Sequence, residues 1–152
     1  MKCKGFTLLE LIIVFIISII LLLASSFFMS CMNHKYIYAV KRELIEIVHF
    51  SRALALSRGE RVCLIPLNDN NWAQGIQLIL ASKKNKQKKI LKVWSFSKKK
   101  LHIEWHGFNN HQQIIFSPSP LNWAVNGKFY ISYHHNQEQI VVNRLGRIVE
   151  VA

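Results

Sequence analysis

Three side chains that can bind a metal or carry a proton alternate along one short stretch of this sequence, at His102, Glu104 and His106. Alternate residues of a β-strand point to the same face, so the three side chains would share one surface if this stretch is a strand. Imidazole and carboxylate groups are metal ligands, and such a surface could be a metal site. The sequence favours a different interpretation, in which they form the solvated face of a strand whose Ile103 and Trp105 enter the core.

Few other residues suggest catalysis. The pair His134-His135 falls between two candidate strands and is expected to form a turn. Nowhere does the spacing of serine, histidine and acidic residues match a hydrolase triad or a metalloprotease helix. The sequence therefore favours a protein that is not an enzyme and that needs no cofactor and no metal.

The three cysteines, Cys3, Cys31 and Cys63, do not form a disulfide framework. If one helix ends at Arg58, Cys31 lies about 40 Å before that end, whereas the five residues from Arg58 to Cys63 reach only about 17 Å. A bridge between Cys31 and Cys63 of one chain is therefore not expected. Cys63 is expected to be a small buried residue instead.

Lysine is concentrated in residues 83–100, KKNKQKKILKVWSFSKKK, where nine lysines occur without an acidic residue. The whole chain has a formal charge of +12, from 20 Lys and Arg against 8 Asp and Glu. Such a charge favours contact with nucleic acid, anionic lipid or an acidic partner, and it does not indicate a fold. Solubility or contacts with neighbouring subunits is the favoured role of these lysines. The alternative is an anion or DNA contact through Lys83, Lys84, Lys86, Lys88 and Lys89.

A single acidic residue, Glu10, interrupts the apolar run of residues 6–32. The run contains no proline or glycine and exceeds the roughly 20 residues that a membrane-spanning helix needs. A carboxylate at the centre of a bilayer costs about 2.5–3.5 kcal/mol, so such an acid is normally paired or functional. Because Lys2 and Lys4 precede the run, the positive-inside rule leaves the N-terminus in the cytoplasm.

Three other interpretations of this run leave its acidic residue unexplained. An uncleaved signal anchor would span the membrane without needing an acid. A secretory signal peptide has a shorter apolar region, of about 7–15 residues, and residues 24–26 offer only a poor cleavage site for it. A lipoprotein signal at Cys31 is weaker still, because the residues before this cysteine are bulky.

The apolar pattern predicts that the helix continues well beyond the run. Over residues 37–55, apolar residues recur every three or four positions, which is one face of an amphipathic helix, while Arg52 and other charged residues lie largely off that face. Gly59 follows Arg58 and is a good C-terminal stop. The sequence therefore predicts one helix over residues 6–58, about 80 Å long.

After Gly59 the pattern changes to short β-rich stretches separated by turn residues, which favours an antiparallel sheet and an α+β fold. The proline-containing stretch 117–120 is expected to be a loop. The expected strands are residues 61–67, 72–80, 90–96, 101–106, 112–116, 128–133, 139–143 and 147–151.

The stretch KGFTLLE, residues 4–10, leads into an unbroken apolar helix and resembles the leader of type IV pilins and pseudopilins. This resemblance implies cleavage between Gly5 and Phe6 by prepilin peptidase, followed by N-methylation of Phe6. It also implies that Glu10 pairs with the N-terminal amine of a neighbouring subunit in the filament. The physics agrees, since an opposite charge within about 4–6 Å favours the ionised carboxylate.

Further stretches make the sequence similar to the GspH/FimT branch of minor pseudopilins. They are SRALALSRGERVC at residues 51–63, WAQG at residues 72–75 and the pair Gly146-Arg147. The second, late cysteine that is frequent in this branch is missing here. The resemblance fits a type II secretion pseudopilus and a type IV pilus alike.

A pilin-like fold is implied, with a long N-terminal helix packed on a small antiparallel β-sheet domain, anchored in the bacterial inner membrane by a single pass. The implied partners are other pilin or pseudopilin subunits, the prepilin peptidase and the membrane. Three parts follow along the chain: a cleaved leader over residues 1–5, a membrane-spanning assembly half of the helix over residues 6–32, and a periplasmic domain over residues 33–152.

Some minor pilins of the FimT type capture DNA during uptake, and the associated feature is a C-terminal Gly-Arg-x-Arg. Here the matching stretch is GRIV, residues 146–149, followed by Glu150, so the second arginine is missing. Arg144 and Arg147 remain on an expected hairpin tip, in addition to the lysines of residues 83–100. Weak DNA binding without sequence preference is therefore the alternative function.

Overall fold

The structure is a computed structural model that describes residues 8–68, 71–80, 89–96, 100–108, 112–119 and 125–149, without the side chains of residues 25–27, 29 and 30. The chain divides into two compact units, Met1–Lys35 and Tyr36–Ala152, which are described separately. Helix α1, Leu8–Arg58, contributes residues to both units.

In the first unit, α1 presents a largely apolar surface. Every side chain from Leu8 to Ala24 is exposed. The hydroxyl of Ser18 donates to the carbonyl oxygen of Val14 at 2.8 Å, which satisfies this polar group within the helix. Among the described residues, no helix is long and apolar enough to cross a membrane. The predicted span over residues 6–32 begins outside these residues and stays a prediction.

In the second unit, α1 is amphipathic, and the predicted apolar face is confirmed. Leu54 is an exception, being only half-buried, whereas Ser51 is fully buried and donates its hydroxyl hydrogen to the carbonyl oxygen of Ile47 at 2.7 Å. The helix ends at Arg58 as predicted, because Gly59 adopts a φ of 64°, a left-handed conformation that glycine reaches without strain. The buried apolar residues of this face are Ile37, Val40, Leu44, Ile47, Val48 and Ala55.

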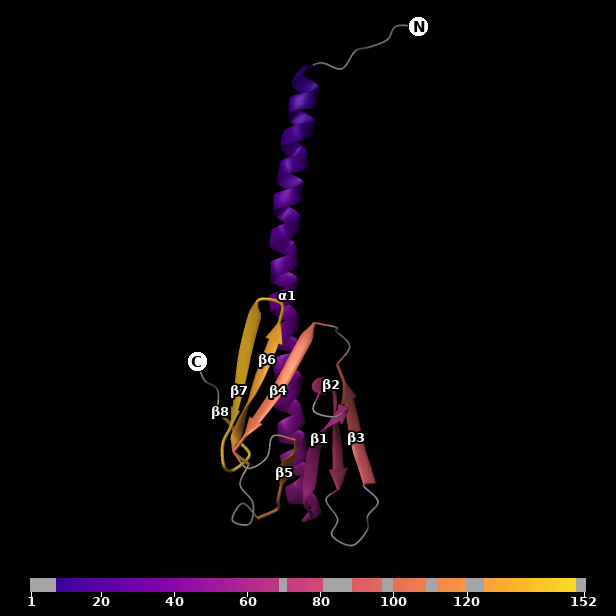
Figure 1. Ribbon diagram of the computed structural model, residues 1–152, viewed down its shortest axis with the longest axis vertical. Coiled ribbons are helices and arrows are strands. Elements are labelled where there is room, and N and C mark those ends of the chain that lie inside the picture. Colours follow the sequence, from indigo (N-terminus) through magenta and orange to yellow (C-terminus); the bar gives the residue numbers. More distant parts are fainter. Residues whose placement is uncertain are drawn as a thin grey trace. The chain divides into compact units, whose positions relative to one another are not determined.

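Within the described residues, the strands form two antiparallel four-stranded sheets, where the sequence predicted one (Figure 1). The first sheet has the order β3-β2-β1-β5, with bounds Lys89–Ser95, Asn71–Leu80, Val62–Asn68 and Ile114–Phe116. The second has the order β4-β6-β7-β8, with bounds Leu101–Gly107, Gly127–Tyr133, Asn136–Val142 and Ile148–Val149.

The largest shift of a strand boundary has a local cause. Strand β7 begins at Asn136, three residues before its predicted start, because His134-His135 form a two-residue turn with a φ of 56° at His134. This tight turn lets Tyr133 pair with Asn136, so the ladder starts immediately. The predicted turn at His134-His135 is confirmed, and the predicted loop is confirmed over residues 117–119.

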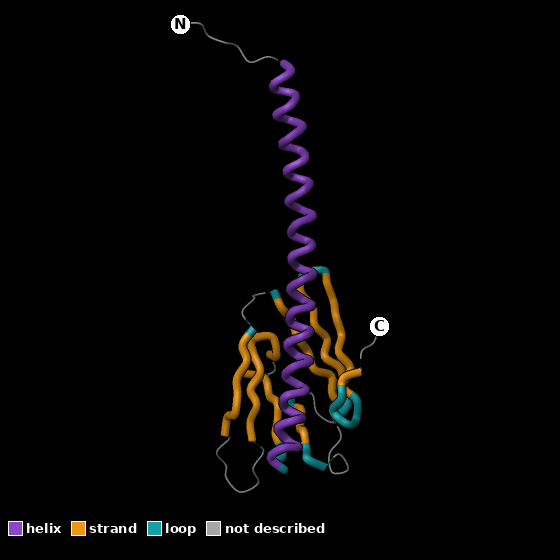
Figure 2. The backbone as a smooth tube through the Cα atoms, turned by 180° about the vertical axis from the view of Figure 1, so that it is seen from behind, coloured by secondary structure: helices purple, strands orange, loops and turns teal. Residues whose placement is uncertain are grey.

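An aromatic cluster joins the two sheets in one core. The ring of Phe129 on β6 is 4.7 Å from that of Trp105 on β4 and 5.7 Å from that of Trp72 on β2, measured between centroids. In the second unit, α1 lies over strands of both sheets (Figure 2). The buried residues of the helix belong to the same apolar cluster as those of the sheets. Cys63 is buried as predicted, and its Sγ atom donates to Oε1 of Gln113 at 3.5 Å.

One ion pair and one aromatic contact join α1 to the second sheet. The Nζ atom of Lys41 donates to Oε2 of Glu138 on β7 at 2.7 Å, and both side chains are about one-fifth exposed. The ring of Tyr36 lies 4.7 Å from that of Tyr133 on β6. Burial, followed by the charges of Tyr133 and Glu43, raises the pKa of Tyr36 above its ordinary value of about 10, so its phenol stays neutral at physiological pH.

Candidate functional site

Glu10 lies in the first turn of α1 with its side chain exposed. A negative charge in the first helical turn interacts favourably with the helix dipole, typically by about 0.3–1 kcal/mol. The large apolar side chains around it, from Leu8 to Leu23, are 42–80% exposed. The helix therefore presents one acid within an apolar surface. The predicted cleavage and methylation residues, Gly5 and Phe6, lie outside the described residues.

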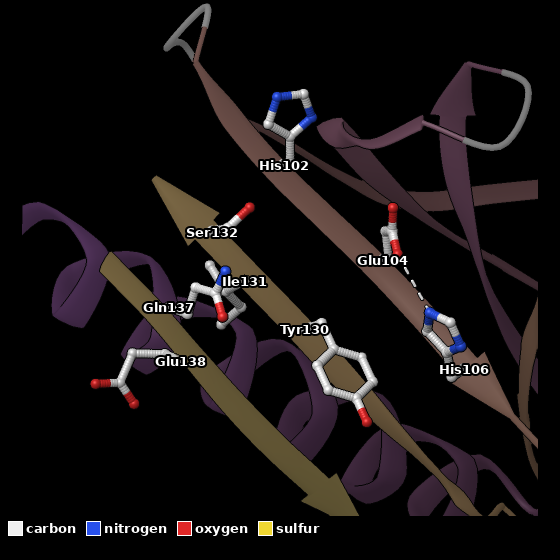
Figure 3. A pocket seen from close by; sticks show the side chains of 8 residues that line it. All are labelled: His102, Glu104, His106, Tyr130, Ile131, Ser132, Gln137 and Glu138. Atoms are coloured by element: carbon white, nitrogen blue, oxygen red, sulfur yellow. Dashed lines mark hydrogen bonds and ion pairs between the residues drawn. The ribbon is translucent and has the colours of Figure 1, made fainter. Parts of the chain in front are cut away.

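The alternation predicted around residue 104 is present on strand β4. His102, Glu104 and His106 are exposed while Ile103 and Trp105 are buried, which confirms the predicted solvated face. With neighbouring side chains from β6 and β7, they line a groove of about 400 Å³ on the outer face of the second sheet (Figure 3).

The groove does not bring its histidines together around one point. Nε2 of His106 is 3.2 Å from Oε2 of Glu104, and its ring makes an edge contact with Tyr130 at 5.1 Å between centroids. His102 lies apart from this pair, nearer the start of β4 (Figure 3). Within the described part of the chain, no group of three or more His, Cys, Asp and Glu side chains is arranged to hold a metal ion.

The basic segment is described only in part. The predicted anion-binding residues Lys83, Lys84, Lys86 and Lys88 lie outside the described residues. Lys89 begins the edge strand β3 and is exposed. Among the described strands, β3 pairs with β2 alone, and its Ile90 and Val93 are 56% and 46% exposed.

Lys92, in the middle of the same edge strand, packs on aromatic rings. Its Nζ atom lies 4.9 Å from the ring centroids of both Phe50 and Trp94, within the distance at which cation–π attraction operates. The rings of Phe50 and Trp94 are in edge-to-face contact at 6.0 Å. These contacts join β3 to α1 and assign a packing role to one lysine of the basic segment.

Arg144 and Arg147 lie on the turn between β7 and β8, and both are exposed. The structure adds a third arginine, Arg52 of α1, which lines the same pocket as these two. The helical period predicts that Arg52 lies largely off the buried helix face, yet its side chain is half-buried. Its position four residues after the buried Val48 was the available signal, since residues four apart are neighbours on a helix.

The first 26 residues of the chain match a family described as the prokaryotic N-terminal methylation motif. No curated protein matches the chain significantly. The match to the methylation motif covers the predicted leader, residues 1–5, and residues 6–26 of the apolar run.

The fold is similar to that of the type IV minor pilin FimU from Pseudomonas aeruginosa strain PAO1, in two crystal forms. One form is 17% identical with a TM-score of 0.62, over 78% of this chain and 90% of that chain. The other is 15% identical with a TM-score of 0.58, over 74% and 90%. At such identities the likeness shows the fold. The chain thus combines a prepilin-like N-terminal motif with the α+β fold of a minor pilin.

Proposed function

We propose that this chain is a minor structural subunit, of the GspH/FimT type, in a type IV pilus or a type II secretion pseudopilus. The carrying observation is the N-terminal methylation motif, which covers residues 1–26 and includes the start of the apolar helix, in a chain with a minor-pilin fold. Such a subunit acts through contacts with other pilin or pseudopilin subunits and needs no catalytic centre and no cofactor.

In this proposal prepilin peptidase cleaves the chain between Gly5 and Phe6 and the new N-terminus is methylated. The exposed apolar side chains of α1 anchor the subunit in the inner membrane by a single pass, and the domain over residues 33–152 lies in the periplasm. Support comes from the methylation motif, from the apolar surface after Leu8 and from the lysines that precede it.

Intact-mass measurement of the chain purified from membranes tests this function. We expect a mature protein that begins at Phe6 and carries one methyl group. Gly5→Val should leave the precursor uncleaved, because a bulky residue replaces the glycine at the cleavage point. Thr7→Ala, which keeps that glycine, is the matched control and should be processed normally. A mature N-terminus near Ser26, or a lipidated Cys31, would contradict the proposal.

Weak DNA binding is a second candidate function. The leader holds two of the positive charges, so the mature chain keeps a formal charge of +10. Arg144 and Arg147 project from one exposed turn, and Lys89 is exposed at the start of β3. Clustered charge of this kind suffices for contacts with phosphates that ignore base sequence.

Fluorescence anisotropy of a labelled duplex, titrated with the full chain at two salt concentrations, tests the second candidate. Affinity should fall with salt, with a log–log slope of roughly −0.9 per phosphate neutralised. Substituting five lysines by glutamine should weaken binding at least about tenfold and flatten this slope. These are Lys83, Lys84, Lys86, Lys88 and Lys89.

A control of equal charge loss separates a local site from net charge. It replaces five basic residues outside residues 83–100 by glutamine, namely the exposed Lys35, Arg42, Arg58 and Lys128 and the half-buried Arg61. Binding that is absent at low salt, or that falls equally in both variants, would rule out a DNA site in the basic segment.

A further inference from the structure

A pocket of about 160 Å³ lies between the end of α1, strand β5 and the turn that follows β7. Three arginines surround it, Arg52 from the helix and Arg144 and Arg147 from the turn. Ser117 and four apolar side chains complete the described lining, with Phe116 and Val125 buried and Leu56 and Leu145 about half exposed. It therefore has a cationic rim and an apolar wall.

The turn that carries two of these arginines is held by a dense set of hydrogen bonds. Oδ1 of Asn143 accepts from the backbone N–H groups of Leu145 at 3.0 Å and Arg147 at 2.9 Å. The N–H of Asn143 donates to the carbonyl oxygen of Arg147 at 2.8 Å, and the N–H of Gly146 donates to that of Asn143 at 2.9 Å. The backbone that presents the arginines is thus preorganised.

Gly146 brings this turn close to the rest of the pocket. Its φ is +68°, and a Cβ atom added there would lie 3.2 Å from the ring of Phe116 and 3.6 Å from Cδ of Arg52. The methylene stem of Arg52 therefore lies near the turn, although about 90 residues separate them in the sequence. The three arginines line one pocket because α1, β5 and the turn after β7 pack against one another.

Among the described residues that line the pocket, none is Asp or Glu, and the ion pairs found among the described residues involve none of its three arginines. Gathering three positive charges is unfavourable unless an anion joins them. Guanidinium groups bind carboxylate and phosphate through paired hydrogen bonds, so the pocket is suited to one anionic group.

We propose that this arginine pocket receives an acidic side chain, flanked by apolar residues, from a neighbouring subunit of the filament. The volume lies below the range of about 300–1,000 Å³ that is usual for small-molecule and cofactor sites, which favours a single side chain. Arginine beside exposed Leu56 and Leu145 matches a protein interface with an apolar core and a polar rim, whereas contacts with a DNA backbone are mostly hydrogen bonds to phosphate and sugar. The inference rests on the proposed filament function.

The arginine Nε–Hε signals in NMR spectra of the ¹⁵N-labelled full chain in detergent micelles report directly on the pocket. The probe is the capped tripeptide Leu-Glu-Leu, with Leu-Gln-Leu as its uncharged match and a short DNA duplex as the competing ligand. We expect Leu-Glu-Leu to shift the signals of Arg52, Arg144 and Arg147 together, with a midpoint of about 1–10 mM, while Leu-Gln-Leu leaves them in place. Single substitutions assign each signal.

Three results would overturn the proposal. Equal shifts with both peptides would mean that the carboxylate is not recognised. If neither peptide shifts the signals, the pocket does not bind an acidic side chain. A duplex that moves these signals at far lower concentration than Leu-Glu-Leu does would assign the pocket to nucleic-acid phosphates instead of a protein partner.

Incorporation into filaments in cells gives the second measurement. Arg52→Gln, Arg144→Gln and Arg147→Gln combined should lower incorporation at least about tenfold relative to a triple variant with the same charge loss outside the pocket. That control carries Arg42→Gln, Arg58→Gln and Lys128→Gln, all at exposed positions outside the pocket and the basic segment. Equal incorporation of the two variants would contradict the proposal. The single exposed change Arg144→Gln should reduce incorporation in the same direction, which guards against misfolding of the triple variant.

Failure of the pocket and failure of the filament function are distinguishable. A chain whose mature N-terminus is not Phe6 would refute the filament function, while the peptide titration would still report on carboxylate binding. A correctly processed chain that enters filaments without its three arginines would refute the pocket alone.

Discussion

Replacing Glu10 with valine is expected to leave the chain cleaved and membrane-bound, but to lower its incorporation into filaments at least about tenfold. The exposed apolar side chains around this acid suit lipid, and a carboxylate among them costs about 2.5–3.5 kcal/mol at the bilayer centre. Valine removes this cost, so anchoring should not suffer. The proposed pairing with the amine of a neighbouring Phe6 disappears, and at about 4 Å such a pair is worth roughly 4 kcal/mol at an effective dielectric of 20.

Ser18→Val is the matched control for this experiment. It makes the same helix surface more apolar without removing a charge, and the hydroxyl that is lost only bonds to the carbonyl oxygen of Val14. The measurement is quantitative immunoblotting of sheared filaments against the membrane fraction. Glu10→Val in filaments at the level of Ser18→Val would show that the acid does not pair during assembly.

The helix and its end could be predicted because both depend on neighbouring residues. A three-to-four residue apolar period gave the buried face of α1, and Gly59 ended the helix where a left-handed residue was needed. The division into two sheets could not be predicted, because strand partners are set by contacts far apart in sequence. Strand β1, for example, pairs with β5, which begins about 50 residues further along.

In the candidate site too, features set by local sequence could be predicted, and features set by tertiary packing could not. The exposed alternation of His102, Glu104 and His106 follows from the local period of a strand and was predicted correctly. Two of the three arginines of the pocket could be predicted to lie together. Arg144 and Arg147 belong to one turn and could be grouped from the sequence, whereas Arg52 reaches them through tertiary packing against Gly146 and Phe116.

Phe129→Ala is expected to destabilise the folded domain by about 3–5 kcal/mol, the range measured for removing a buried phenylalanine ring. The side chain is 0% exposed and lies between Trp72 of the first sheet and Trp105 of the second. Alanine leaves a cavity where the two sheets meet. The neighbouring rings cannot collapse freely into it, because the backbone of β6 is paired on both sides. Such a loss is a large part of the 5–15 kcal/mol typical of a whole protein.

Urea unfolding of the full chain in detergent, followed by tryptophan emission, measures this loss as a fall in the midpoint of more than about 1 M. Tyr130→Ala is the matched control, since it removes an aromatic ring at the next position of the same strand. Tyr130 faces the outer groove and is 44% exposed, so its loss should cost less than about 1 kcal/mol. Equal shifts for the two variants would mean that the aromatic cluster does not join the sheets. The stability of the domain would then have to come from the contacts of α1 with each sheet separately, and Lys41→Ala, which breaks the 2.7 Å contact with Glu138, would become the more damaging change.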